Sequence, residues 1–264
     1  MRRFFCLIGL LLLAACAQEP ARRAVKVVTL STADMDALMA QQSLDCAEDS
    51  CPDAVARLFV VNFQDASKST LCTGTLVGPR LLLTNSHCLE NGSLTQTCQG
   101  FYAVFNTKSK GHEVARCASI RYRHNFTTKG TKLSARDYAL VELDRDVHAE
   151  IPGLDRAGFT PGEAVFPFVV DHINIQRARI VRLECSASDE TRNGRDFVLK
   201  RCPAIGGNSG SPIMNDRGEV AGVLYAAQDT TVSEVTDLPM RIEAETISLG
   251  FPMNRVLEDL DPWL

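Results

Sequence analysis

The chain has 264 residues, of which 45% are hydrophobic and 23% charged, and its formal net charge is −4. This is the composition of a globular protein with a sizeable core. Neither a basic patch nor a polybasic run is present, so nucleic acid and anionic membrane surfaces are not favoured as partners.

The N-terminus has the pattern of an export signal. Arg2 and Arg3 precede the apolar run 4–13, which is shorter than the roughly 20 residues of a membrane span. The following Leu-Ala-Ala-Cys, which ends at Cys16, resembles the lipobox of bacterial lipoproteins. This resemblance implies that residues 1–15 are a lipoprotein signal peptide and that Cys16 carries a lipid anchor. We therefore expect a location at the bacterial cell envelope, lipid-anchored in the periplasm or outer membrane. The alternative is an ordinary secretory signal.

The cysteine count favours disulfides. Ten cysteines become eight once Cys6 and Cys16 are assigned to the signal and the anchor, and an even number in an exported protein indicates disulfide bonds. A zinc cluster is the alternative, but the sequence has no CxxC pair and no HExxH motif. We expect neither a metal nor a cofactor.

After the signal, the chain divides into a tether and a β-rich part. Residues 16–52 are expected to be a tether with at most a short peripheral helix near residues 34–42. From residue 53 onward, short β-rich runs alternate with Gly, Pro, Asn and Asp, which is typical of all-β domains. The predicted strands are 57–63, 72–77, 81–85, 102–105, 113–121, 137–143, 164–170, 178–186, 196–201, 212–214, 220–225 and 247–251, with a helix at 253–260. The two halves, about 53–150 and 151–264, predict two packed barrels.

The stretch GGNSGSP, residues Gly206–Pro212, places one hydroxyl, that of Ser209, among three glycines. Glycine allows backbone conformations that turn N–H groups towards the oxygen of a group under attack. The same residue types also form ordinary turns, so the stretch alone leaves both interpretations open.

A serine nucleophile needs a base in hydrogen-bond reach, and the base needs a carboxylate that orients it. His87 follows the apolar strand 81–85 and would lie at a rigid strand end. Asp137 opens a second apolar strand, where a carboxylate is costly unless it is paired; a solvated aspartate is the alternative. The other histidines are expected to be surface residues: His112, His124, His148 and His172.

Four motifs together resemble the chymotrypsin-like serine peptidases. They are Cys72-Thr-Gly-Thr-Leu-Val-Gly, Leu83-Thr-Asn-Ser-His-Cys, Asp137-Tyr-Ala-Leu-Val and Gly207-Asn-Ser-Gly-Ser-Pro. The likeness is greatest to the bacterial glutamyl-endopeptidase branch and extends over residues 54–262. It implies an all-β fold of two packed six-stranded antiparallel barrels with a short C-terminal helix, and protein or peptide substrates.

The resemblance also implies a role for each site residue. His87, Asp137 and Ser209 would form a catalytic triad, and the N–H groups of Gly207 and Ser209 would form the oxyanion hole. It implies a Cys72–Cys88 disulfide. Cys185 and Cys202 flank a hairpin around residues 193–194, so we predict a disulfide between them as well. Cys98–Cys117 and Cys46–Cys51 are then the remaining predicted pairs.

The sequence departs from the family at two places. Digestive members carry an aspartate before the serine, which pairs with a newly cut N-terminus; here Asn208 holds that position, so we expect no activation by proteolysis. Pro203 stands where trypsin-like members have an aspartate, and residues 223–227 lack the histidine of glutamate-specific members. We expect the pocket to take a small or aliphatic side chain. The predicted substrate-binding residues of this pocket are Tyr225, Ala226 and Ala227.

Two functions are therefore considered. The first is a serine endopeptidase, and the alternative is a catalytically inactive peptide-binding or adhesive module on the same scaffold. All three triad members are present, which favours catalysis.

Overall fold

A computed structural model describes residues 31–48, 51–63, 69–89, 98–123, 136–191, 194–227 and 246–264. The predicted signal peptide, Cys16 and His124 lie outside the described residues. In the part of the chain that the structure describes, no helix is long and apolar enough to cross a membrane.

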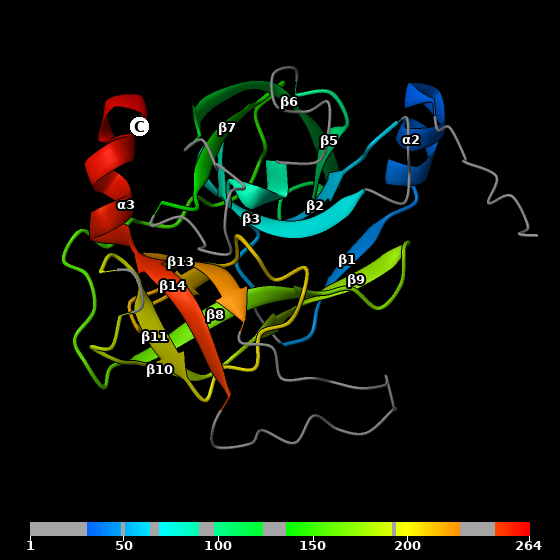
Figure 1. Cartoon of the computed structure of the whole chain (residues 1–264). Coiled ribbons are helices and arrows are strands. Elements are labelled where there is room, and N and C mark those ends of the chain that lie inside the picture. Colours follow the sequence, from blue (N-terminus) through cyan, green and yellow to red (C-terminus); the bar gives the residue numbers. More distant parts are fainter. Residues whose placement is uncertain are drawn as a thin grey trace, which may run out of the picture.

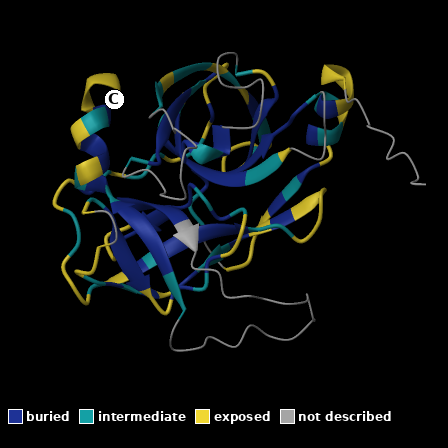
Figure 2. Ribbon diagram, in the orientation of Figure 1, coloured by how far each residue is buried: buried dark blue, intermediate teal, exposed yellow. Residues whose placement is uncertain are grey.

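The first β-barrel is closed, with the strand order β2-β3-β4-β7-β6-β5 (Figure 1). Its strands are β2 (Val55–Val60), β3 (Thr70–Gly78), β4 (Leu81–Thr84), β5 (Phe101–Thr107), β6 (Gly111–Arg123) and β7 (Ala139–Leu143). Large apolar side chains such as Leu58, Leu82 and Phe105 fill its interior. Dark blue ribbon in Figure 2 marks the buried residues of its strands. A tight turn at residues 78–81 joins β3 to β4. A short 3₁₀ helix, η3 (His87–Leu89), follows β4.

The second barrel has the order β8-β10-β11-β14-β13-β12 and closes because β12 also pairs with β8. Its strands are β8 (Ala164–Asp171), β10 (Cys185–Ala187), β11 (Phe197–Lys200), β12 (Pro212–Met214), β13 (Val220–Ala227) and β14 (Ile247–Pro252). β9 (Arg177–Arg182) also pairs with β8, so the single strand predicted at 178–186 is divided into β9 and β10. The predicted fold of two six-stranded antiparallel barrels is confirmed.

The C-terminal helix is found where it was predicted. α3 (Met253–Leu260) buries four apolar side chains, those of Met253, Val256, Leu257 and Leu260, and η5 (Asp261–Trp263) follows it. These side chains lie about a helical turn apart, so they form one apolar face that joins the core of the second barrel.

The N-terminal segment, residues 31–48, is structured and differs from the expected tether. α2 (Thr32–Met39) begins with a capping box between Ser31 and Asp34 and packs Met35 and Met39 into a cluster with residues of the first barrel. β1 (Ser43–Cys46) then pairs in parallel with β9 of the second barrel. The segment therefore contacts both barrels (Figure 1).

The structure contains the four predicted disulfides. They are Cys46–Cys51, Cys72–Cys88, Cys98–Cys117 and Cys185–Cys202. The first closes the end of the N-terminal segment, and the second joins β3 to η3, next to His87.

Candidate active site

His87 and Asp137 form a closely hydrogen-bonded pair. The His87 Nδ1 lies 2.6 Å from the Asp137 Oδ2, and the backbone N–H of His87 donates to the Asp137 Oδ1 at 2.9 Å. The Asp137 side chain is fully buried, whereas the His87 side chain is 28% exposed. A carboxylate in this position fixes the orientation of the ring and the tautomer with the proton on Nδ1, which leaves Nε2 as a proton acceptor.

Two polar residues between β4 and η3 set this geometry. The Asn85 side-chain amide donates to the Asp137 carbonyl at 2.7 Å, and the Ser86 hydroxyl donates to the Tyr138 carbonyl at 2.6 Å. Both side chains are buried, so their hydrogen bonds are made away from competing water. The Thr-Asn-Ser-His sequence therefore connects the end of β4, through hydrogen bonds, to the backbone segment that carries Asp137.

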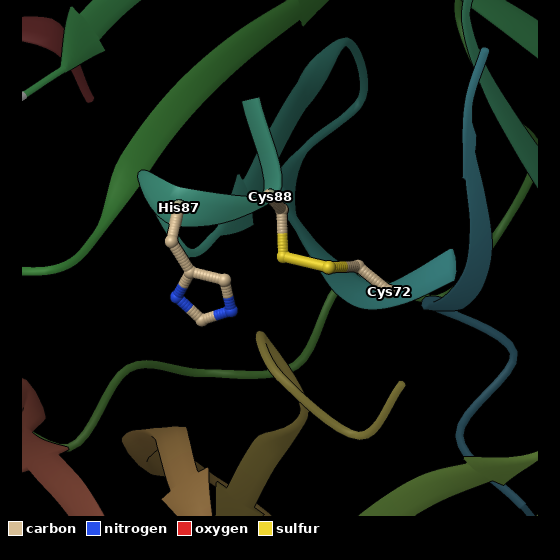
Figure 3. Close-up of side chains that lie close together, drawn as sticks. All are labelled: Cys72, His87 and Cys88. Atoms are coloured by element: carbon tan, nitrogen blue, oxygen red, sulfur yellow. A yellow bond between two sulfur atoms is a disulfide. The ribbon is translucent and has the colours of Figure 1, made fainter. Parts of the chain in front are cut away.

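The Ser209 backbone lies against Thr73 and Cys88, at the Cys72–Cys88 disulfide and close to His87. Its carbonyl accepts the Thr73 N–H at 2.8 Å and lies 3.9 Å from the Cys88 Sγ. Figure 3 shows the His87 ring beside the Cys72–Cys88 disulfide. These two sulfurs and a His87 nitrogen lie within 4.8 Å of one another, but disulfide sulfurs are not thiolates, so the three atoms are not a metal site.

The residues before Ser209 form a turn that requires glycine. The Asn208 N–H donates to the Ile205 carbonyl at 3.1 Å, and Gly207 has a φ of +92°. A positive φ at the third residue is the mark of a type II turn and is strained for any residue with a Cβ. The N–H groups of Gly207 and Ser209 take no part in the hydrogen bond that closes the turn.

Gly210 allows the loop to dock on the first barrel. Its φ is +89°, and a Cβ there would collide with the Thr73 carbonyl and the Thr84 Oγ1. The Thr84 hydroxyl already donates to the Thr73 carbonyl at 2.8 Å. Gly210 thus allows β3 and the end of β4 to lie against the loop that carries Ser209.

Asn208 closes this loop with neutral hydrogen bonds. Its side chain is buried; the Oδ1 accepts the Ile205 N–H at 2.8 Å, and the Nδ2 donates to the Val170 carbonyl at 3.0 Å. Both partners belong to the second barrel, so the side chain is satisfied without a charged group.

The strand predicted to line the pocket places Tyr225 in the core. Its side chain is buried, its hydroxyl donates to the Asp196 Oδ2 at 2.5 Å, and its ring stacks on Phe251 at 4.3 Å. Ala226 and Ala227 continue β13 and pair with β14. Contact between residues 225–227 and a substrate therefore stays a prediction, and for Tyr225 it concerns the backbone.

The sequence did not lead us to expect a role at the site for two residues beside the Ser209 loop, His172 and Arg57. His172, expected to be a surface residue, is half-buried, and its Nδ1 accepts a hydrogen bond from the Nε–H of buried Arg57 at 3.1 Å. The available signal was Arg57 itself, because it is the one charged residue in a strand whose six residues are all buried.

Comparisons with known proteins assign the chain to a family and support its fold. The family model described as a trypsin-like peptidase domain matches residues 72–223, more than half of the chain. A solved structure of GrC is similar with a TM-score of 0.60 and 11% identity, covering 83% of this chain and 98% of the other. Neuropsin, a serine protease expressed in the limbic system of mouse brain, gives a TM-score of 0.59 at 14% identity, covering 83% and 99%. A Glu endopeptidase gives 0.57 at 18% identity, covering 83% and 94%. No curated protein sequence is similar enough to match the chain.

Proposed function

Because the chain belongs to the family of trypsin-like peptidase domains, we propose that it is a serine endopeptidase with Ser209, His87 and Asp137 as its catalytic triad. The observation that carries this proposal is the hydrogen-bonded pair of a buried Asp137 and a partly exposed His87. The attachment of the Ser209 backbone to Thr73, beside the Cys72–Cys88 disulfide, supports it.

The reaction proceeds through an acyl-enzyme. The Ser209 Oγ attacks the carbonyl carbon of the scissile peptide while the His87 Nε2 takes the hydroxyl proton. The oxyanion of the tetrahedral intermediate accepts hydrogen bonds from the Gly207 and Ser209 N–H groups. As the C–N bond breaks, His87 gives its proton to the leaving amine. Water then attacks the ester, His87 takes a proton from it, and the acid is released as Ser209 recovers its hydrogen.

Asp137 stabilises the charge that forms on His87. When the ring becomes an imidazolium, both of its N–H groups are donors, and Nδ1–H already faces the Asp137 carboxylate. The turn hydrogen bond is donated by the Asn208 N–H, so the Gly207 N–H takes no part in it, as the other half of the mechanism requires.

A fluorophosphonate probe tests this function without knowledge of the natural substrate. Wild type is expected to be labelled covalently, and the Ser209→Ala and His87→Ala variants are expected to lose labelling. Ser109→Ala and His148→Ala are matched controls, because these residues form surface contacts away from Ser209 and should be labelled like wild type. Folded wild type that takes up no probe would instead favour the inactive peptide-binding or adhesive module.

Specificity and location are further parts of the proposal. On its motifs, the chain stands near the glutamyl-endopeptidase branch, but we propose cleavage after small or aliphatic residues, because the pocket strand carries Tyr225, Ala226 and Ala227 instead of a histidine. A peptide library would reveal the preference.

We propose lipid attachment at Cys16 at the bacterial cell envelope, which should appear as fatty-acid labelling that Cys16→Ala abolishes.

A further inference from the structure

A buried arginine connects the N-terminal segment to the second barrel. Arg57, in β2, has no exposed surface. Its guanidinium donates to three neutral acceptors: the His172 Nδ1 at 3.1 Å, the Gln42 Oε1 at 2.8 Å and the Asn174 carbonyl at 2.7 Å. No acidic side chain among the described residues forms an ion pair with it. Burial lowers the pKa of Arg57 to about 10, so the group remains charged at neutral pH.

Such an arginine is unfavourable for folding unless its hydrogen bonds are all made. Removing a guanidinium from water costs several kcal/mol, and neutral acceptors offset less of this than a carboxylate does. The three acceptors come from two separate parts of the chain: Gln42 precedes β1, and His172 and Asn174 lie in the loop between β8 and β9. Arg57 therefore fixes these parts relative to one another and relative to the first barrel.

The hydrogen bond from Arg57 determines the state of the His172 ring. Because Nδ1 accepts a hydrogen bond, the neutral ring carries its proton on Nε2. Burial and the charge of Arg57 lower the pKa of His172 to about 4, while the Gly207 backbone and Asp171 oppose this shift. The ring is therefore neutral, with a fixed tautomer, at neutral pH.

The far edge of this ring lies against Gly207. A Cβ at Gly207 would be 2.8 Å from the His172 Cδ2 and 2.9 Å from its Nε2. From the first barrel, the Thr73 hydroxyl donates to the Gly207 carbonyl at 3.0 Å. Gly207 is thus held between the two barrels in the positive-φ conformation of the type II turn. A type I turn would need a negative φ there and would reverse the peptide that carries the Gly207 N–H.

We propose that His172 is a positioning residue for the oxyanion hole: Arg57 fixes its ring, the ring holds Gly207, and Gln42 of the N-terminal segment completes the support. This inference rests on the proposed function, since the direction of the Gly207 N–H affects a reaction only if Ser209 is the nucleophile. It assigns a role in the chemistry to a segment that precedes both barrels.

The rate of phosphonylation by diisopropyl fluorophosphate tests it on the full chain, because the reacting phosphoryl oxygen gains negative charge as Ser209 attacks. His172→Leu keeps a similar volume but removes the acceptor. We expect its maximal inactivation rate to fall roughly 10-fold to 100-fold, with the apparent affinity for the reagent within about twofold of wild type. His172→Gln, whose amide oxygen can accept the Arg57 Nε–H, should recover most of the rate. Gln42→Leu should lower the rate in the same direction by a smaller factor.

His112→Leu is the matched control. His112 is more exposed than His172, but it also contacts the N-terminal segment, through the Met39 carbonyl at 3.1 Å, and it does not contact Gly207. It should keep the wild-type rate, and thermal melting should confirm that each variant is folded. If folded His172→Leu reacts like wild type, or loses affinity without losing rate, the inference is wrong while the proposed function stands. If His172→Leu does not fold, an unchanged rate for Gln42→Leu overturns the inference. If wild type itself does not react, the proposed function fails and the inference with it.

Discussion

His172 is a residue whose surroundings favour its neutral form. Its pKa in the folded chain is about 4, against 6.5 for an ordinary histidine, because burial and Arg57 disfavour the charged ring. Between these two values the unfolded chain binds a proton that the folded chain does not. The contribution of His172 to stability is therefore complete above pH 6.5 and is lost as the pH falls towards 4.

This dependence predicts a difference between wild type and His172→Gln, which has no titratable group at this position. Wild type should lose more of its free energy of unfolding than the variant as the pH falls through this window. Urea unfolding at several pH values measures both curves, and the carboxylates common to the two proteins cancel in the difference. Parallel curves would contradict the assignment of a lowered pKa to His172.

Single residues differ in how far the sequence predicts their roles. His87, Asp137 and Ser209 stand in motifs whose local chemistry is readable, and the first two are paired as expected. Arg57 and His172 look ordinary in isolation, because each acquires its role from a partner 115 residues away in the sequence. Contacts of this kind depend on the final packing, and local sequence does not encode them.

At the scale of the elements, α3 holds both neighbours of Asp137. The Tyr138 hydroxyl donates to the Asp259 carboxylate, and the Arg136 Nε lies 3.3 Å from the same group. Burial, followed by the hydrogen bond to Asp259, raises the pKa of Tyr138, so the phenol stays a donor. The C-terminal helix therefore contributes to fixing the segment that presents Asp137 to His87.

Replacing Asp259 with alanine should destabilise the protein by about 1–3 kcal/mol, because the buried Tyr138 hydroxyl loses its carboxylate acceptor. Glu258→Ala is the control in the same helix. Glu258 forms exposed ion pairs with Arg195 and Arg255, and such pairs contribute about 1 kcal/mol or less. Free energies of unfolding from denaturant titrations compare the two variants, and equal losses would count against a special role for Asp259.

The strands could be predicted where local sequence patterns determine the structure. From β2 to β14, the short β-rich runs separated by turn residues correspond to the observed strands, except that one predicted strand is divided into β9 and β10. The agreement follows because alternation and turn chemistry are local properties. The structure of the N-terminal segment could not be predicted from such local patterns. Only Met35, Met39 and Leu44 of it are apolar and buried, and β1 pairs with β9, which lies more than a hundred residues later. Neither feature produces a periodic signal in the sequence.

At the scale of the whole molecule, the N-terminal segment joins the two barrels. The N-terminal segment packs α2 on the first barrel and pairs β1 with the second. The Ser209 loop is closed by Asn208 with the Ile205 N–H and the Val170 carbonyl. A newly cut N-terminus would have no buried carboxylate to pair with at this position. The intact chain is therefore expected to be active.

A protease recognition site inserted at residues 49–50 tests this expectation. The Cys46–Cys51 disulfide spans the cut, so α2 and β1 should stay attached after cleavage. We expect the fluorophosphonate labelling rate of the uncut chain to equal or exceed that of the cut chain, because the Ser209 loop is already closed by neutral hydrogen bonds. Wild type incubated with the same protease controls for cleavage elsewhere. Should the cut raise the rate by about tenfold or more, a difference of about 1.4 kcal/mol in the activation barrier, the new N-terminus would have to order the loop. Asn208 would then not replace the aspartate switch of the digestive members.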